Sequence, residues 1–183
     1  TGGIAGQMRP FSDNILTENC INNGKVVSKQ ACTGGIVGLC TRGKINNCTN
    51  NAQIESESWA VGGITGQLGV YNTTYGYVCK TKADINNCTN NINSDISGTY
   101  NIGGIAGWIT NGSSVTKCGN KSNIVSNAYV STSDKTSRAG GIIGIIAQYG
   151  INKVTYCYNI GNVTAVGGKN GGIAGWTNTA ASA

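Results

Sequence analysis

The 183-residue sequence contains no histidine, one proline, one phenylalanine and one methionine. Without histidine, His-based acid–base catalysis and most zinc and iron sites are excluded. Charged residues make up only 11% of the chain, and its seven carboxylates are scattered. Polysaccharide-cleaving enzymes need carboxylates gathered at one place. We therefore expect neither an enzyme nor a bound metal or cofactor.

The abundant residues point to a β-rich protein. The chain holds 29 Gly, 24 Asn and 21 Ile, and both Gly and Asn are poor residues for helix interiors. The net charge of +6 comes from 13 Lys and Arg that are scattered singly. Because no basic run is interleaved with aromatic residues, no nucleic-acid partner is expected. No apolar run is long enough for membrane insertion.

A two-block repeat runs through the chain. The first block reads Gly-Gly-Ile-x-Gly and occurs six times, at 2–6, 34–38, 62–66, 103–107, 140–144 and 171–175. The second block ends in a cysteine and follows the first five copies, with its cysteines at Cys20, Cys48, Cys88, Cys118 and Cys157. Two residues beyond each cysteine stands an asparagine, at Asn22, Asn50, Asn90, Asn120 and Asn159. Repeats of this length are typical of solenoids.

Each block predicts local structure. The Gly-Gly pair suits a tight corner, the Ile after it points inward, and the third Gly ends a short strand. The segment that leads to the cysteine forms a second strand, and the asparagine makes a left-handed turn before a third. Three strands repeated every ~30 residues predict an all-β fold, a parallel β-solenoid (β-helix) of about five to six coils with loop insertions. We expect one domain over 1–176 and a tail over 177–183.

Identical positions should stack as ladders along the solenoid axis, since neighbouring strands lie about 4.8 Å apart. The repeat cysteines are predicted to form a buried ladder of free thiols, because in-register parallel strands fit disulfide geometry poorly. The repeat asparagines are predicted to bond from coil to coil through their amides. Cys40 and Cys79 lie outside the ladder, and a disulfide between them would pin the third-coil insertion. The alternative is two unlinked thiols.

The quoted strings resemble the GLUG motif, a repeat of bacterial surface and secreted proteins that include adhesin-like proteins and non-catalytic parts of IgA-specific peptidases. The resemblance extends from Gly2 to Trp176, and Thr17 departs from it where other copies have Ile or Val. It implies an extracellular or cell-surface solenoid without chemistry of its own. An Asn-rich eukaryotic surface protein would satisfy the same pattern.

Two functions follow as expectations. The first is a structural or adhesive segment that forms, or belongs to, a surface fibre or adhesin by end-to-end stacking of coils. Its partner is then another copy, head to tail, or flanking repeats of a longer chain. The alternative is a module that binds carbohydrate or a host ligand through exposed aromatic residues, since aromatic rings stack on sugars. The candidates for that role are Tyr71, Tyr75, Tyr77 and Trp108.

Overall fold

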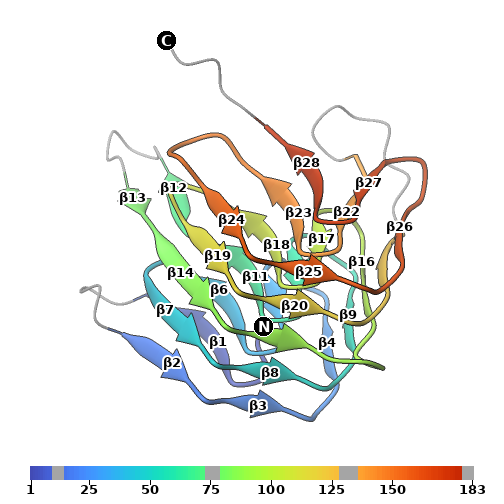
Figure 1. The fold of residues 1–183 in the computed structure, drawn as a ribbon, viewed down its shortest axis with the longest axis horizontal. Helices are drawn as coiled ribbons and strands as arrows, with labels where there is room; N and C mark the ends of the chain where they lie inside the picture. The colour runs from blue at the N-terminus through green and yellow to red at the C-terminus, as the bar shows by residue number, and fades with distance from the viewer. Residues whose placement is uncertain (10–14, 73–78, 128–135, 179–183) are drawn as a thin grey trace.

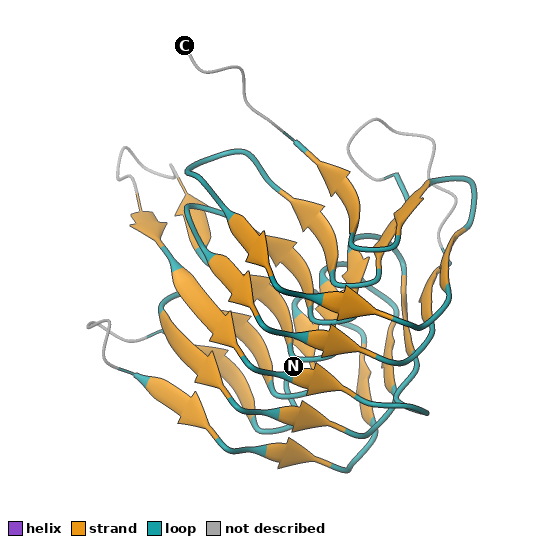
Figure 2. Cartoon of the chain, viewed as in Figure 1, coloured by secondary structure: helices purple, strands orange, loops and turns teal. Residues whose placement is uncertain are grey.

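The computed structural model describes residues 1–9, 15–72, 79–127 and 136–178 (Figure 1). These residues form strands and no helix (Figure 2). The chain winds through five short strands per turn, and each strand pairs in parallel with its counterpart in the next turn. The fold is therefore a parallel β-solenoid, as the repeat predicts.

Two sheets come from the Gly-Gly-Ile blocks. Sheet 1 consists of β5 (Thr33–Gly34), β10 (Val61–Gly62), β17 (Ile102–Gly103), β22 (Arg138–Gly140) and β27 (Lys169–Gly171). Sheet 2 consists of β1 (Ala5–Met8), β6 (Val37–Cys40), β11 (Thr65–Leu68), β18 (Ala106–Ile109), β23 (Ile143–Ile146) and β28 (Ala174–Thr177). The last strand thus includes Thr177, the first residue of the expected tail.

Three sheets come from the cysteine blocks and the residues after them. Sheet 3 consists of β2 (Leu16–Glu18), β7 (Gly43–Asn46), β14 (Ala83–Asn86), β19 (Ser114–Thr116) and β24 (Lys153–Thr155). Sheet 4 consists of β3 (Ile21–Asn22), β8 (Thr49–Asn50), β15 (Thr89–Asn90), β20 (Gly119–Asn120) and β25 (Tyr158–Asn159). Sheet 5 consists of β4 (Val26–Ser28), β9 (Ile54–Ser56), β16 (Ile96–Gly98), β21 (Ile124–Ser126) and β26 (Val163–Ala165).

The expectation of three strands per coil is wrong, because each block contains a bend that divides it in two. In the second copy, β5 ends at Gly34 and β6 begins at Val37, so the bend falls on Gly35 and Ile36. The third glycine, Gly38, lies inside β6 and does not end the strand. The cysteine block bends in the same way between sheets 3 and 4.

The left-handed residue of the cysteine block is not the one expected. The ladder asparagines are absent from the positive-φ positions, and the residue directly before each ladder cysteine has φ between 53° and 56°. These residues are Asn19, Asn47, Asn87, Lys117 and Tyr156. In the first three copies an asparagine supplies the left-handed corner, as asparagine does readily.

The Gly-Gly pairs are required by close approach, since none of their glycines has a positive φ. A Cβ on Gly34 would collide with the carbonyl oxygen of Val37 across the bend. A Cβ on Gly35 would lie 2.5 Å from Oδ1 of Asn50, on the opposite wall of the same coil. The second glycine therefore leaves room for the ladder asparagine, which makes the two blocks of a repeat one packing unit.

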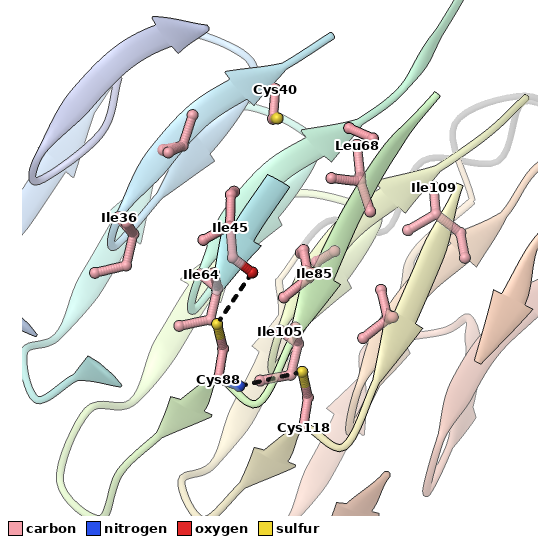
Figure 3. Packing of buried hydrophobic residues seen from close by; sticks show 14 of the residues in the cluster. Ile36, Cys40, Ile45, Ile64, Leu68, Ile85, Cys88, Ile105, Ile109 and Cys118 are labelled. Carbon is pink, nitrogen blue, oxygen red and sulfur yellow. Dashed lines mark hydrogen bonds between the residues drawn. The ribbon is translucent and has the colours of Figure 1, made fainter. Parts of the chain in front are cut away.

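The interior is divided into two apolar clusters. The larger lies between sheets 2 and 3 and contains the isoleucines of the four inner Gly-Gly-Ile blocks together with Ile45, Ile85 and the repeat cysteines (Figure 3). The smaller lies between sheets 5 and 1, around Ile54, Ile96 and Ile102. Asn50, Asn90 and Asn120 are fully buried in sheet 4, which lies between sheets 3 and 5 along each coil.

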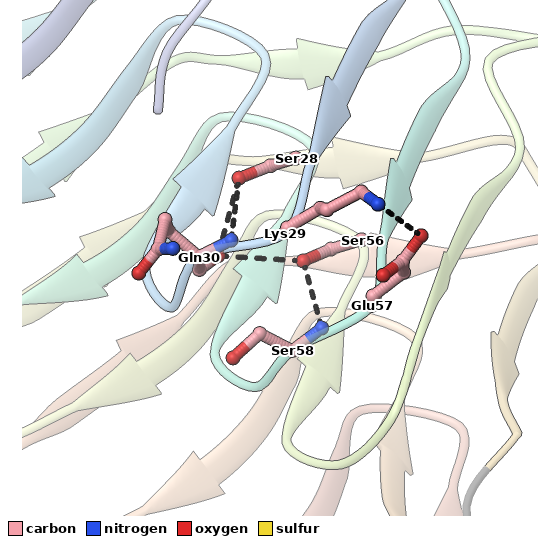
Figure 4. A network of polar contacts seen from close by, with 6 residues as sticks. All are labelled: Ser28, Lys29, Gln30, Ser56, Glu57 and Ser58. Atoms are coloured by element: carbon pink, nitrogen blue, oxygen red, sulfur yellow. Dashed lines mark hydrogen bonds and ion pairs between the residues drawn. The ribbon is translucent and has the colours of Figure 1, made fainter.

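Two further features of the wall are an inserted hairpin and a repeated turn. The third coil carries an antiparallel hairpin of β12 (Val70–Asn72) and β13 (Cys79–Thr81), which leaves the solenoid between sheets 2 and 3 at Gly69, φ 77°. At the corner after sheet 5, Ser28 and Ser56 each accept a bond from the backbone N–H two residues on, at 3.1 and 3.2 Å (Figure 4). Equivalent turns are thereby fixed in successive coils.

Candidate functional site: the ladders and the end faces

The inner asparagine ladder predicted from the sequence is present and continuous. Each amide Nδ2 donates to Oδ1 of the asparagine in the next coil. The four distances are 2.8 Å from Asn22 to Asn50, 2.8 Å from Asn50 to Asn90, 2.8 Å from Asn90 to Asn120, and 2.7 Å from Asn120 to Asn159. Since unpaired polar groups are costly in an apolar interior, this ladder fixes the register between coils.

Further asparagines form outer rows that the sequence reasoning missed. Asn51 Nδ2 donates to Asn23 Oδ1 at 2.9 Å, and Asn91 Nδ2 donates to Asn51 Oδ1 at 2.7 Å. Asn87 Nδ2 donates to Asn47 Oδ1 at 2.8 Å. The signal was an asparagine directly after, or three residues before, a ladder asparagine in several copies. These outer bonds are exposed and contribute less than the inner ones.

The repeat cysteines are free thiols that line one wall of the larger cluster. The backbone N–H of Cys48 donates to Sγ of Cys88, and that of Cys88 donates to Sγ of Cys118, both at 3.4 Å. Cys48, Cys88 and Cys118 are fully buried, whereas Cys20 and Cys157, at the two ends, are partly exposed. The ladder of unlinked thiols predicted from the spacing is therefore what the structure shows.

The thiols of the ladder influence one another's ionisation. Hydrogen bonds from Cys157 and Cys88 lower the pKa of the Cys118 thiol. Donating to Cys118 in turn raises the pKa of Cys88 and of Cys157, because a thiol that has lost its proton can no longer donate. Because each lowered pKa depends on a neighbouring thiol that keeps its proton, a row coupled in this way does not ionise as a whole.

The disulfide considered between Cys40 and Cys79 is not formed, because Cys40 is a free, fully buried thiol. Cys40 lies in sheet 2, between Met8 and Leu68, and its Sγ donates to the carbonyl oxygen of Arg42. Burial raises the pKa of Cys40 to about 12. Cys79 begins β13, and its side chain lies outside the described residues.

Of the aromatic candidates, only Trp108 can be placed. It projects from β18, half-buried, with its ring 5.6 Å from that of Trp59. Trp59 in turn stacks on Tyr100 at 6.1 Å, in the equivalent place one coil further on. Tyr75 and Tyr77 lie outside the described residues, as does the side chain of Tyr71. The rings of Trp59 and Tyr100 are nearly parallel, at an interplanar angle of 12°, whereas those of Trp59 and Trp108 are tilted by 57°.

A second aromatic contact lies near the last coil. The guanidinium of the buried Arg138 is 3.9 Å from the ring centroid of Trp176, and the ammonium of Lys169 is 4.3 Å from it. Arg138 also donates to Oδ1 of Asn101 at 3.1 Å. The contact with Arg138 of β22 attaches β28 to the coil beneath it, whereas that with Lys169 lies within the last coil.

The described residues contain no cluster of three or more Cys, Asp or Glu side chains that could hold a metal ion. Nor do they include a helix that could span a membrane. Two of the described carboxylates each contact a single side chain of a neighbouring coil. Glu55 forms an ion pair with Lys25 at 2.7 Å, and Asp84 accepts a hydrogen bond from Ser114 at 2.6 Å. These contacts join neighbouring coils.

No described residue covers either end face of the solenoid. The isoleucines of the four inner Gly-Gly-Ile blocks are 0% exposed, but Ile4 is 49% exposed at the first coil and Ile173 is 41% exposed at the last. Ile21 and Ile151 are also exposed on the end coils. The outer edges of the terminal strands, such as β2 and β24, pair with no other described strand. Both faces therefore offer backbone and apolar groups to another strand.

Comparison with known proteins gives no relative: no family model matches the chain, and neither does any curated protein or solved structure.

Proposed function

We propose that this chain is a structural solenoid segment of a surface fibre or adhesin, and that it functions by end-to-end stacking of coils. The observation that carries the proposal is the state of the end faces. Ile4 and Ile173 occupy positions that are completely buried in every inner coil. Burial of such a side chain contributes about 1.5–3 kcal/mol, so a further coil at either face would be stabilised by the same contacts as the inner ones.

The low charge of the chain supports this proposal. Only 20 of its 183 residues are charged (13 Lys and Arg plus 7 Asp and Glu), so little repulsion opposes contact between two end faces. The faces are also unlike each other, because one shows the first coil and the other the last. A contact between unlike faces repeats without closing and gives an open filament.

Sedimentation velocity of the chain over micromolar to submillimolar concentrations tests the proposal. We expect species that grow with concentration, and fibres in electron micrographs. Val154→Lys should abolish growth, because Val154 packs on the core at the C-terminal face and a neighbouring coil would bury the new charge. Thr155→Lys is the matched control, since Thr155 is exposed on the outer side of the same strand. A monomer at all concentrations overturns the proposal.

The extracellular and adhesin-like setting rests on the resemblance of the repeat to the GLUG motif, together with the lack of catalytic groups among the described residues. Antibodies against the chain should then label intact, unpermeabilised cells of its source. Labelling only after permeabilisation would contradict that setting.

No observation on the described residues favours the carbohydrate-binding alternative. Trp108 has Trp59 at its side, and Trp59 and Tyr100 stack face to face. A sugar ring needs a free aromatic face, and the stacking of Trp59 on Tyr100 uses one face of each of these two rings.

A further inference from the structure

The outer side of sheets 3 and 4 changes along the solenoid while its inner side does not. These two sheets lie side by side and form one wall of the molecule (Figure 1). In the second and third coils the segment of this wall is identical, Ile-Asn-Asn-Cys-Thr-Asn-Asn, at 45–51 and 85–91. The fourth and fifth coils keep its inward cysteine and inward ladder asparagine but replace all four outward residues. Packing of the interior therefore does not explain the replacements.

In the fourth coil two of the replacements are basic. Lys117 and Lys121 occupy the places that Asn87 and Asn91 hold in the third coil. In the third coil these places continue the outer asparagine rows, with amide bonds of 2.8 and 2.7 Å to the coil before. Neither ammonium forms an ion pair with another described residue. Both positive charges are thus directed to the surroundings of the wall.

In the fifth coil the replacements are aromatic or apolar. Tyr156 and Ile160 stand at the places of the two lysines and are 83% and 69% exposed. Tyr158 pairs with Gly119 and points outward, because the ladder asparagine that follows each of them points inward. Its ring lies on Gly119, where a Cβ would be 2.3 Å from Cζ of the tyrosine. These directions are set by the sheet register, so further coils stacked along the axis would leave the side chains on the wall.

The wall gathers cations that the sequence scatters. Lys44 and Lys153 lie in one outward row of sheet 3, and Lys82 lines a shallow hollow together with Lys44 and Asp84. With Lys117 and Lys121 this makes five lysines, against the two carboxylates of Asp84 and Glu18, for a net charge of +3. Residues 96–127 and 136–178 contain no Asp or Glu. The whole excess of positive charge therefore lies in the fourth and fifth coils, beside the exposed tyrosines.

We propose that this wall docks on the surface of an anionic phospholipid bilayer. Lysines are attracted to acidic headgroups, and the amphipathic rings of tyrosine fit the boundary between headgroups and acyl chains. A soluble polyanion would attract the same lysines but would leave Tyr156 and Ile160 in water, whereas the bilayer boundary buries both. The combination of charge and exposed apolar side chains on one wall therefore favours lipid, and no segment has to cross the bilayer.

This docking goes beyond the proposed function and does not rest on it. The wall runs parallel to the solenoid axis, and the end faces are not part of it. A single copy therefore presents the complete surface. A filament of copies would lie on the bilayer side-on and would repeat the same contact along its length.

Cosedimentation with vesicles tests the charges. The chain should bind vesicles of phosphatidylcholine and phosphatidylserine, should not bind phosphatidylcholine alone, and should bind more weakly at high salt. The double variant Lys117→Asn, Lys121→Asn installs the residue type of the third coil, so its fold should be retained, which circular dichroism checks. It should weaken binding about 25-fold, roughly fivefold for each lysine. The matched control Lys25→Asn, Lys29→Asn removes the same charge beside sheet 5 and should change binding by less than about twofold.

A second variant tests the apolar part of the wall. Tyr158→Thr, Ile160→Asn again copies the third coil and leaves the net charge unchanged. It should weaken binding to the anionic vesicles several-fold, while binding to dextran sulfate, a soluble polyanion, should not change. Its control is Val27→Thr, which alters a side chain that is 63% exposed on sheet 5 and should have no effect.

The outcomes are distinct from those of the stacking experiment. Equal binding to both kinds of vesicle, or an equal loss in the Lys25 and Lys29 control, overturns the inference. Binding of dextran sulfate or single-stranded DNA without binding of vesicles also overturns it, and makes the wall a site for soluble polyanions. Vesicle binding by a chain that sediments as a monomer supports docking even where stacking fails. Growth of filaments that do not bind vesicles refutes docking and leaves stacking in place.

Discussion

The substitution Asn90→Ala measures how much the inner ladder contributes to stability. Asn90 is fully buried; it accepts from Asn50 Nδ2 and donates to Asn120 Oδ1, both at 2.8 Å. Alanine in its place leaves one buried donor hydrogen and one buried acceptor without that partner. Each such group costs about 1–3 kcal/mol, which gives a loss of about 2–6 kcal/mol in the free energy of unfolding.

The matched control is Asn51→Ala. Asn51 also accepts one amide bond and donates another, at 2.7 and 2.9 Å, but it lies in an exposed outer row. Water replaces both of its partners, so the loss should stay within about 0.5 kcal/mol. Urea unfolding followed by circular dichroism measures both variants. Thermal unfolding should show a fall of roughly 2–4 °C per kcal/mol lost. Equal losses for the two variants would falsify the reasoning that burial makes the inner ladder essential.

Three further predictions follow from packing and ionisation. Gly66→Ala should strongly lower the free energy of unfolding measured in urea, because its Cβ would clash with the backbone at Cys32. Its control is Gly6→Ala, at the same repeat position in the first coil, which should be nearly neutral because no atom lies within 4 Å of the added Cβ. Ile64→Asp should abolish the cooperative thermal transition, because it buries an unpaired charge; a melting temperature close to wild type would place Ile64 outside the core. The pKa of the Cys40 thiol is raised from about 9 in the unfolded chain to about 12 in the folded one. As the pH rises above about 9, the unfolded chain therefore loses the thiol proton before the folded chain does. Stability should then fall by up to about 1.4 kcal/mol per pH unit between the unfolded and folded pKa values. The fall should be smaller in Cys40→Val; an identical pH dependence in both proteins would contradict the assignment.

Several features of the fold could be predicted from the sequence because stacking makes equal positions touch. In a solenoid the neighbours of Asn90 are the same residue type one coil before and after it, so a repeated residue predicts its own contacts. The inward isoleucines and the free cysteine ladder follow for the same reason. Repetition alone could not locate the bends. The left-handed residue before the cysteine is Asn in three copies but Lys117 and Tyr156 in two, so no single residue type marks it.

Neither the aromatic cluster nor the lack of a disulfide at Cys40 could be predicted from the sequence, for a different reason. Trp59 and Tyr100 are 41 positions apart in the chain, and they meet because the hairpin of the third coil is looped out without a shift in the register of the sheets. The hairpin also takes Cys79 away from the wall, to a place opposite Asn72, while Cys40 remains in sheet 2. Insertion lengths in a sequence do not show which residues are looped out.

By itself, the sequence determined the parallel stack, its number of layers and the identity of the cysteine ladder and the inner asparagine ladder, because these depend only on the period of the repeat. The tertiary structure alone decided the direction of the asparagine ladder and the contact between the second glycine of each of the first five blocks and a ladder asparagine. These depend on which atom of an amide faces the next coil and where each bend falls. Both are set by packing across the solenoid, from Gly35 to Asn50 for example, and not by any residue's local preference.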